Sequence, residues 1–130
     1  MENIKQKDRR QTDLKDRFYR FALEVVKLVR TLPKETAGFQ LGSQLIKAGT
    51  SVAANYEEAT GAFSKPDFVF KVSIAFKEAK ESRIWLRLIR DSGLCRKTPE
   101  IEMLIQEALE IASILAKSLK TARVNSEQKK

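Results

Sequence analysis

The chain has 130 residues, one cysteine and no histidine, and it carries a formal net charge of +8. This length suits one domain with a proper hydrophobic core. The single cysteine excludes an internal disulfide, and the missing histidine removes the commonest acid–base group and metal ligand near neutral pH. No apolar stretch approaches the roughly 18 residues that span a bilayer, and residues 1–11 lack the apolar segment of a signal peptide. We therefore expect a cytoplasmic protein with acidic partners and no membrane association.

Apolar residues recur in steps of three and four along four segments of the chain, which is typical of amphipathic helices. The first helix is predicted over residues 12–32, where Pro33 ends it. The second is predicted over residues 37–60, with Gly42 and Gly49 on one face. Because glycine costs about 1 kcal/mol in a helix interior, these two positions indicate close approach of a neighbouring helix.

The third helix is predicted over residues 64–92, with Ser64 as its N-cap and a proline and an aspartate in its first turn. Gly93 suits the position after its C-terminal end. A similar threonine–proline–glutamate sequence opens the fourth helix, which is predicted over residues 98–124.

The three connections are each about five residues long, and connections that short make consecutive helices antiparallel neighbours. The sequence thus predicts an all-α protein, an antiparallel up-down four-helix bundle. The bundle domain is expected over residues 12–124, with a polar tail at residues 1–11 and a basic tail at residues 125–130.

The third helix carries more apolar residues than one core stripe can hold. Its core stripe comprises Phe68, Val72, Ala75, Ala79, Ser82, Leu86 and Ile89. Apolar residues outside that stripe include Phe70, Ile74, Trp85 and Leu88. A helix that is apolar most of the way round lies either at the centre of a protein or at an interface, and no helix of a four-helix bundle is central. We expect a homo-oligomer that forms through these four residues, with help from the first or second helix. The alternative is that the aromatic side chains fold back over the bundle ends.

Five polar residues form a candidate cluster between the second and third helices. They are Ser51, Asn55, Glu58, Glu78 and Glu81. Paired carboxylates can act in acid–base catalysis, but no nucleophile or phosphate-binding loop accompanies them. Di-iron bundles combine glutamate with histidine, which is absent here. We interpret the five residues as structural and expect no catalytic residues, metal or cofactor; a carboxylate-based hydrolase is the minor alternative.

Basic residues recur on one face of three helices and are the candidate nucleic-acid contacts. They are Arg17, Arg20, Lys27 and Arg30 on the first helix, Lys80, Arg83, Arg87 and Arg90 on the third, and Lys117, Lys120 and Arg123 on the fourth. Such stripes can neutralise phosphates without reading sequence. The stripes on the first and third helices are expected at a common end of the bundle, because those helices run in the same direction. The alternative is that the cations only solvate the surface.

Two stretches resemble the signature of a known family. Residues 44–59 read QLIKAGTSVAANYEEA, and the stretch at 68–88 contains Lys-Glu-Ala-x-Glu-x-x-x-Trp-Leu. They resemble the four-helix-bundle family of 23S rRNA intervening-sequence proteins, and the resemblance covers about residues 14–120. It implies a bacterial protein that assembles as a pentameric ring. It also implies a relation to the accessory variability protein of diversity-generating retroelements, which binds nucleic acid and reverse transcriptase.

Charge placement and this resemblance together predict a non-enzymatic, basic homo-oligomer, a homopentamer, that binds RNA or DNA through phosphate contacts. The second hypothesis is a structural bundle for protein interaction, which docks a partner enzyme such as a reverse transcriptase.

Overall fold

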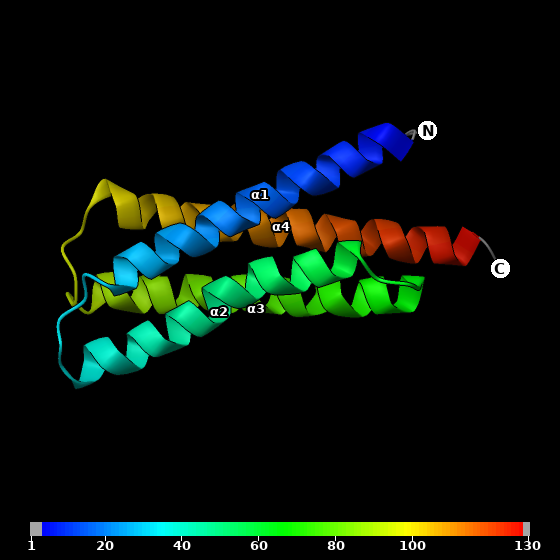
Figure 1. Cartoon of the computed structure of the whole chain (residues 1–130). Coiled ribbons are helices and arrows are strands. Elements are labelled where there is room, and N and C mark those ends of the chain that lie inside the picture. Colours follow the sequence, from blue (N-terminus) through cyan, green and yellow to red (C-terminus); the bar gives the residue numbers. More distant parts are fainter. Residues whose placement is uncertain (1–3, 129–130) are drawn as a thin grey trace.

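The computed structural model describes residues 4–128, with side chains as far as residue 125, and consists of four long helices (Figure 1). The helices are α1 (Ile4–Val29), α2 (Thr36–Thr60), α3 (Lys65–Asp91) and α4 (Pro99–Gln128). They run alternately in opposite directions, and no strand occurs in the described residues. The predicted antiparallel all-α four-helix bundle is confirmed. Within the same range, no helix combines the length and apolar character needed to cross a bilayer.

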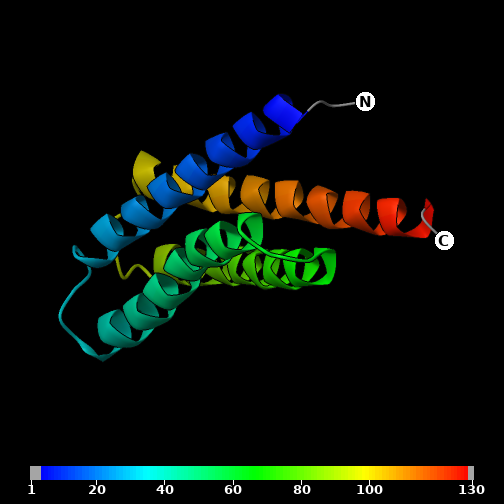
Figure 2. The same ribbon diagram turned by 45° about the vertical axis from the view of Figure 1, so that its right-hand side comes forward.

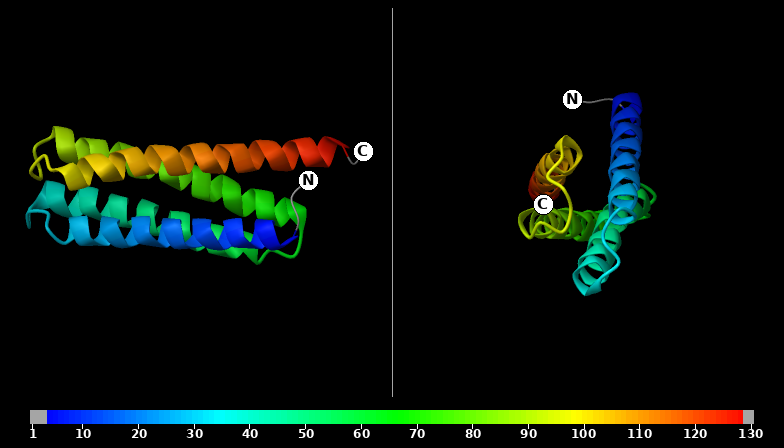
Figure 3. Two further views of the ribbon diagram at one scale, coloured as in Figure 1. Left: turned by 90° about the horizontal axis from the view of Figure 1, so that it is seen from above. Right: turned by 90° about the vertical axis from the view of Figure 1, so that its left-hand side faces the viewer.

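The connections place the chain ends at one end of the bundle. The α1–α2 and α3–α4 connections lie together at one end, and the α2–α3 connection lies at the other with both ends of the described chain (Figure 1). Contacts are most extensive between α2 and α3 and least extensive between α1 and α4. The start of α1 leans away from α4 (Figure 2), and seen along the bundle α1 and α4 are set apart (Figure 3, right).

The first and last helices, α1 and α4, are longer than the apolar pattern predicts. Residues 4–11, expected as a tail, are helical, and all of them except Gln11 are exposed. Helix α4 likewise continues to Gln128, into the segment 125–130 that was expected as a tail; residues 129–130 lie outside the described part. Lysine, arginine and glutamine favour helices, so these turns are helical. Because they have no apolar face, the apolar pattern of the sequence does not predict them.

The predicted capping residues lie where the sequence places them. The Ser64 hydroxyl oxygen accepts a hydrogen bond from the backbone N–H of Asp67, at 3.2 Å, and so caps α3. After α3, Gly93 adopts a φ of 74°, a left-handed conformation that glycine tolerates best. These two residues mark where α3 begins and ends.

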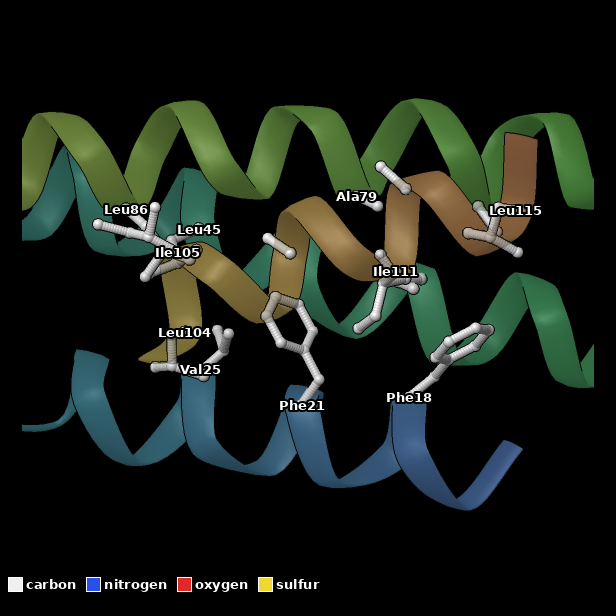
Figure 4. Packing of buried hydrophobic residues seen from close by; sticks show 14 of the residues in the cluster. Phe18, Phe21, Val25, Leu45, Ala79, Leu86, Leu104, Ile105, Ile111 and Leu115 are labelled. Atoms are coloured by element: carbon white, nitrogen blue, oxygen red, sulfur yellow. The ribbon is translucent and has the colours of Figure 1, made fainter. Parts of the chain in front are cut away.

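All four helices contribute to one buried core (Figure 4). In α3 the residues of the predicted core stripe are buried except for Phe68, which is half-buried and packs against the core. Phe18 of α1 meets Tyr56 of α2 edge-on, with ring centroids 4.9 Å apart and an interplanar angle of 75°. Burial raises the pKa of Tyr56 to about 12. The core therefore follows the helical periodicity of the sequence closely.

The two glycines inside α2 lie directly against α1. A Cβ atom at Gly42 would lie 3.0 Å from Cγ1 of Val29, and one at Gly49 would lie 3.0 Å from Cγ1 of Val25. Real Cβ atoms rarely come so close to a neighbour, so a side chain at either position would force the facing valine to shift. The close helix approach that the sequence indicates is confirmed.

Replacing Gly38 with alanine is expected to lower the free energy of unfolding by about 1–3 kcal/mol or more. Gly38 is buried in the first turn of α2, and an added methyl group would overlap the backbone carbonyl oxygen of Pro33, which no rotamer change can move. Gly61→Ala is the matched control, because the nearest atom there lies 3.8 Å from the Cβ position. Urea denaturation measures both variants, and equal stabilities would contradict the prediction.

Candidate nucleic-acid interface

Arg17, one of the predicted phosphate contacts, instead joins α1 to α4. Its Nε donates to Oε2 of Glu107 at 2.8 Å and its Nη2 donates to Oε1 of the same residue at 2.6 Å. Glu110 adds a contact at 3.4 Å. The hydrogen bonds that Arg17 donates to Glu107 raise the pKa of Arg17, against the opposing effect of burial. This bidentate pair connects the two helices that otherwise contact each other least.

Two further predicted cations have acidic partners. Arg90 Nε lies 2.7 Å from Asp91 Oδ1, and Arg90 Nη1 lies 3.1 Å from Glu102 Oε2 at the start of α4. Lys27 lies 3.2 Å from Glu24, one turn earlier in α1. Like the Arg17 pair, the contact between Arg90 and Glu102 holds two helices together. These residues are less available to a phosphate than their positions in the sequence suggest.

The remaining basic residues of α3 are in varied environments. Lys80 Nζ lies 4.7 Å from the centroid of the Phe76 ring, within the range of a cation–π contact. Arg83 is half-buried, and its Nε is buried without a hydrogen-bond partner among the described residues. Arg87 is exposed and forms no ion pair with a described residue. The basic stripe of α3 is therefore not a row of equivalent solvated cations.

The basic stripe of α4 is different, because all three of its cations are exposed. Lys117, Lys120 and Arg123 follow one another at three-residue spacing near the end of α4. Within the part of the chain that the structure describes, none of them forms an ion pair. Arg20 of α1 and Arg30, directly after α1, share these properties, but they lie away from this row.

The three basic stripes do not form one surface. The C-terminal ends of α1 and α3 lie at the same end of the bundle, as expected, whereas the end of α4 lies at the opposite end (Figure 1). Moreover, α1 and α3 lie diagonally across the bundle, and their backbones do not come close to each other among the described residues. The α4 stripe therefore stands apart as a separate candidate contact surface.

One member of the polar cluster, Glu58 of α2, contacts α3 directly. Lys71 of α3 pairs with Glu58 of α2 at 3.1 Å. Asn55 donates from Nδ2 to the carbonyl oxygen of Ser51 at 2.9 Å and to its hydroxyl oxygen at 2.8 Å. Of these contacts, the Glu58–Lys71 pair crosses between the helices and can help to set their register, whereas the Asn55 hydrogen bonds stay within α2.

The two glutamates of α3 lie side by side next to a lysine of α2. Burial raises the pKa of Glu78, and the neighbouring Glu81 raises it further. Lys77 and Lys47 act in the opposite direction, so the second helix faces this pair with a cation. Among the described residues, no group of three or more side chains is arranged to hold a metal ion.

The predicted oligomer residues are only partly available. Phe70 and Leu88 are exposed, whereas Ile74 and Trp85 are half-buried. Trp85 packs against the core, and its indole N–H is buried without a hydrogen-bond partner among the described residues. Ile84, which the sequence analysis did not select, is 50% exposed and lies one turn before Leu88.

A groove between α1 and α2 was also missed by the sequence analysis. It has a volume of about 650 Å³ and is lined by the exposed Tyr19 and Leu23 of α1 and by Ala53 and Ala54 of α2. Two apolar residues four apart on α1, facing small residues on α2, are the only sequence signal for it. The groove gives the chain a second apolar surface, distinct from that of α3.

Fold and surface together define a basic, all-α bundle protein with exposed cations on α4. The family model of the 23S rRNA-intervening sequence protein matches residues 10–117, and the chain belongs to this family. It is similar to the crystal structure of a protein with unknown function from the S23 ribosomal protein family of Bacteroides thetaiotaomicron. That likeness has a TM-score of 0.75 and 34% identity, and it covers 82% of this chain and 98% of the other. Comparison with curated proteins gives no match.

Proposed function

We propose that this protein is a homo-oligomeric RNA-binding accessory protein whose principal phosphate contacts are Lys117, Lys120 and Arg123. The observation that carries the proposal is that these three cations are exposed in a row without an ion pair to any described residue. Binding phosphate there breaks no described ion pair, and release of counterions drives association. Arg17 and Arg90, by contrast, would first have to leave their acidic partners.

The charge and the family both support an RNA ligand. The net charge of +8 favours a polyanion, and contacts from lysine and arginine on a helix surface favour the backbone over base edges. The name of the family, 23S rRNA-intervening sequence protein, supports an RNA-related role. DNA of the same length and charge is the comparison that separates RNA binding from general phosphate binding.

Self-association would multiply this surface. The α1–α2 groove, with Tyr19 and Leu23, and the outer face of α3, with Ile84 and Leu88, are two different apolar surfaces on one chain. A contact between one surface and the other on the next copy is heterologous, and such contacts form a closed ring when the rotation closes. In a ring, the α4 stripe recurs once in each subunit and forms a band of cations.

The variant Lys117→Gln/Lys120→Gln/Arg123→Gln is expected to bind RNA more weakly, with a salt dependence whose slope of log K against log salt is smaller by about 3. Fluorescence anisotropy across a range of salt concentrations measures both the affinity and the slope. The control is Lys27→Gln/Lys71→Gln/Arg90→Gln, which removes the same charge from cations that already have acidic partners. Surface ion pairs contribute little stability, so the control protein folds.

Two results would contradict the proposal. One is wild-type binding that does not depend on salt, and the other is the absence of RNA and DNA binding at low salt. The second result would favour the bundle that docks a partner enzyme such as a reverse transcriptase. An equal loss in both triple variants would show that net charge, rather than the α4 stripe, determines the affinity.

A further inference from the structure

A groove between the start of α3 and the end of α4 lies beside the α4 stripe. It has a volume of about 530 Å³, and its lining includes Val69 and Phe70 of α3 and Ala122 of α4. Two cations also line it, Lys65 from α3 and Arg123 from α4. Among the described residues that line this groove, none is acidic. The groove thus combines an apolar surface with positive charge from both helices.

Phe70 gives the groove a flat apolar face. Its side chain is 59% exposed near the start of α3, in a groove that Lys65 and Arg123 also line. The apolar pattern of the sequence predicts that Phe70 joins Leu88 in the subunit contact, but the two residues are separated by about 27 Å of helix at 1.5 Å per residue. Phe70 is therefore close to the phosphate contacts proposed on α4 and distant from the exposed apolar residues near the other end of α3.

We propose that this groove binds single-stranded RNA, with a base stacked on the ring of Phe70 and the adjoining phosphates held by Lys65 and Arg123. The inference rests on the proposed function and specifies its substrate class. Proteins that bind single strands combine a cationic groove with aromatic side chains on which bases stack. A duplex keeps its bases stacked on each other, so it can use the cations but not the ring.

Neighbouring residues extend the same surface. Lys117 and Lys120 continue the line of cations from Arg123 along α4, over about 9 Å of helix. Phe63, in the α2–α3 connection two residues before Lys65, is fully exposed and offers a second ring at the same end of the bundle. A single strand that crosses the groove would thus find phosphate contacts on α4 and aromatic surface on and before α3.

The test compares Phe70→Ala with Phe70→Trp, which keeps a stacking ring, and with Phe39→Ala. Phe39 is 62% exposed and lies near the start of α2, at the opposite end of the bundle. Its exposure therefore matches that of Phe70, but it lies far from the groove. The probes are a labelled oligouridine, the oligothymidine of the same length and an RNA duplex, measured by fluorescence anisotropy at low salt. Light scattering and thermal unfolding on each variant show whether assembly and folding are unchanged.

Phe70→Ala is expected to weaken oligouridine binding by about 5- to 150-fold, the effect of losing one stacked base. Duplex binding should change by less than about twofold, since its contacts are with phosphates alone. Phe70→Trp should restore binding, and Phe39→Ala should leave it unchanged. Oligothymidine bound as tightly as oligouridine would overturn the RNA part of the proposal.

Three results would overturn the groove proposal as a whole. They are unchanged oligouridine binding in Phe70→Ala, an equal loss for the single strand and the duplex, and dissociation of the oligomer by Phe70→Ala. In each of these cases the proposed function still stands if the α4 triple variant lowers affinity for both probes. If the wild-type protein binds no nucleic acid at low salt, both proposals fail.

Discussion

Phe18→Ala is expected to lower the free energy of unfolding by about 3–5 kcal/mol. The Phe18 side chain is completely buried and packs edge-on against Tyr56, with ring centroids 4.9 Å apart. Alanine would remove this contact and leave a cavity between α1 and α2, because a close-packed core relaxes only in part. Domains of ordinary size are stable by about 5–15 kcal/mol, so this change removes a large fraction of the total. Urea denaturation followed by circular dichroism measures it.

Phe63→Ala serves as the control for that measurement. It removes the same side chain from a fully exposed position in the α2–α3 connection, where the expected change is within about 0.5 kcal/mol. A loss of less than about 1 kcal/mol in Phe18→Ala would mean that α1 is held mainly by contacts other than its buried aromatic face.

The sequence predicts the fold well because a buried core requires apolar residues to recur at helical spacing along the chain. Residues of α4 such as Ile101, Ala108 and Leu115 recur at seven-residue spacing, and all three are completely buried. The spacing of apolar residues does not predict a helical segment that has no buried face. Residues 4–10 are helical but exposed, and the apolar pattern therefore starts the first helix too late.

The candidate site is harder to predict, because a helix face shows which cations lie together but not what lies opposite them. Arg17 and Glu107 are 90 positions apart, and only the packing of α1 against α4 reveals that they pair. Such a pairing changes Arg17 from a candidate phosphate contact into a link between helices. By contrast, Lys117 and Lys120 lie where no described acidic residue pairs with them, which the sequence alone could not show.

The apolar surfaces illustrate the same limit. Trp85 and Ile84 are consecutive residues of α3, yet the first packs against the core and the second is 50% exposed. Which of them is available depends on how neighbouring helices flank α3. The α1–α2 groove likewise exists only because Tyr19 and Leu23 lie beside the small residues of α2. Surfaces shared by two helices therefore become visible only once the helices are paired.

That groove leads to the second large expected effect, which is loss of assembly in Leu23→Glu. Leu23 is 41% exposed in the separate chain, so the monomer should tolerate a glutamate. In the proposed ring, Ile84 and Leu88 of the next copy would cover it. A carboxylate buried there without a partner costs several kcal/mol at every subunit contact, which is enough to convert an oligomer into monomers at micromolar concentrations. Sedimentation velocity over a range of concentrations measures the change.

Met103→Glu is the control for this variant, since Met103 is 70% exposed on α4 and does not line the groove.

Leu88→Glu provides the complementary test. A heterologous contact needs both of its surfaces, so Leu23→Glu and Leu88→Glu should dissociate the protein to a similar degree. If only Leu88→Glu dissociates it, the subunits meet through α3 on both sides, as in a two-fold dimer, and a ring built from two different surfaces is ruled out. A wild-type protein that sediments as a monomer at all concentrations would rule out self-association itself, and RNA binding would then rest on the three cations of a single α4 helix.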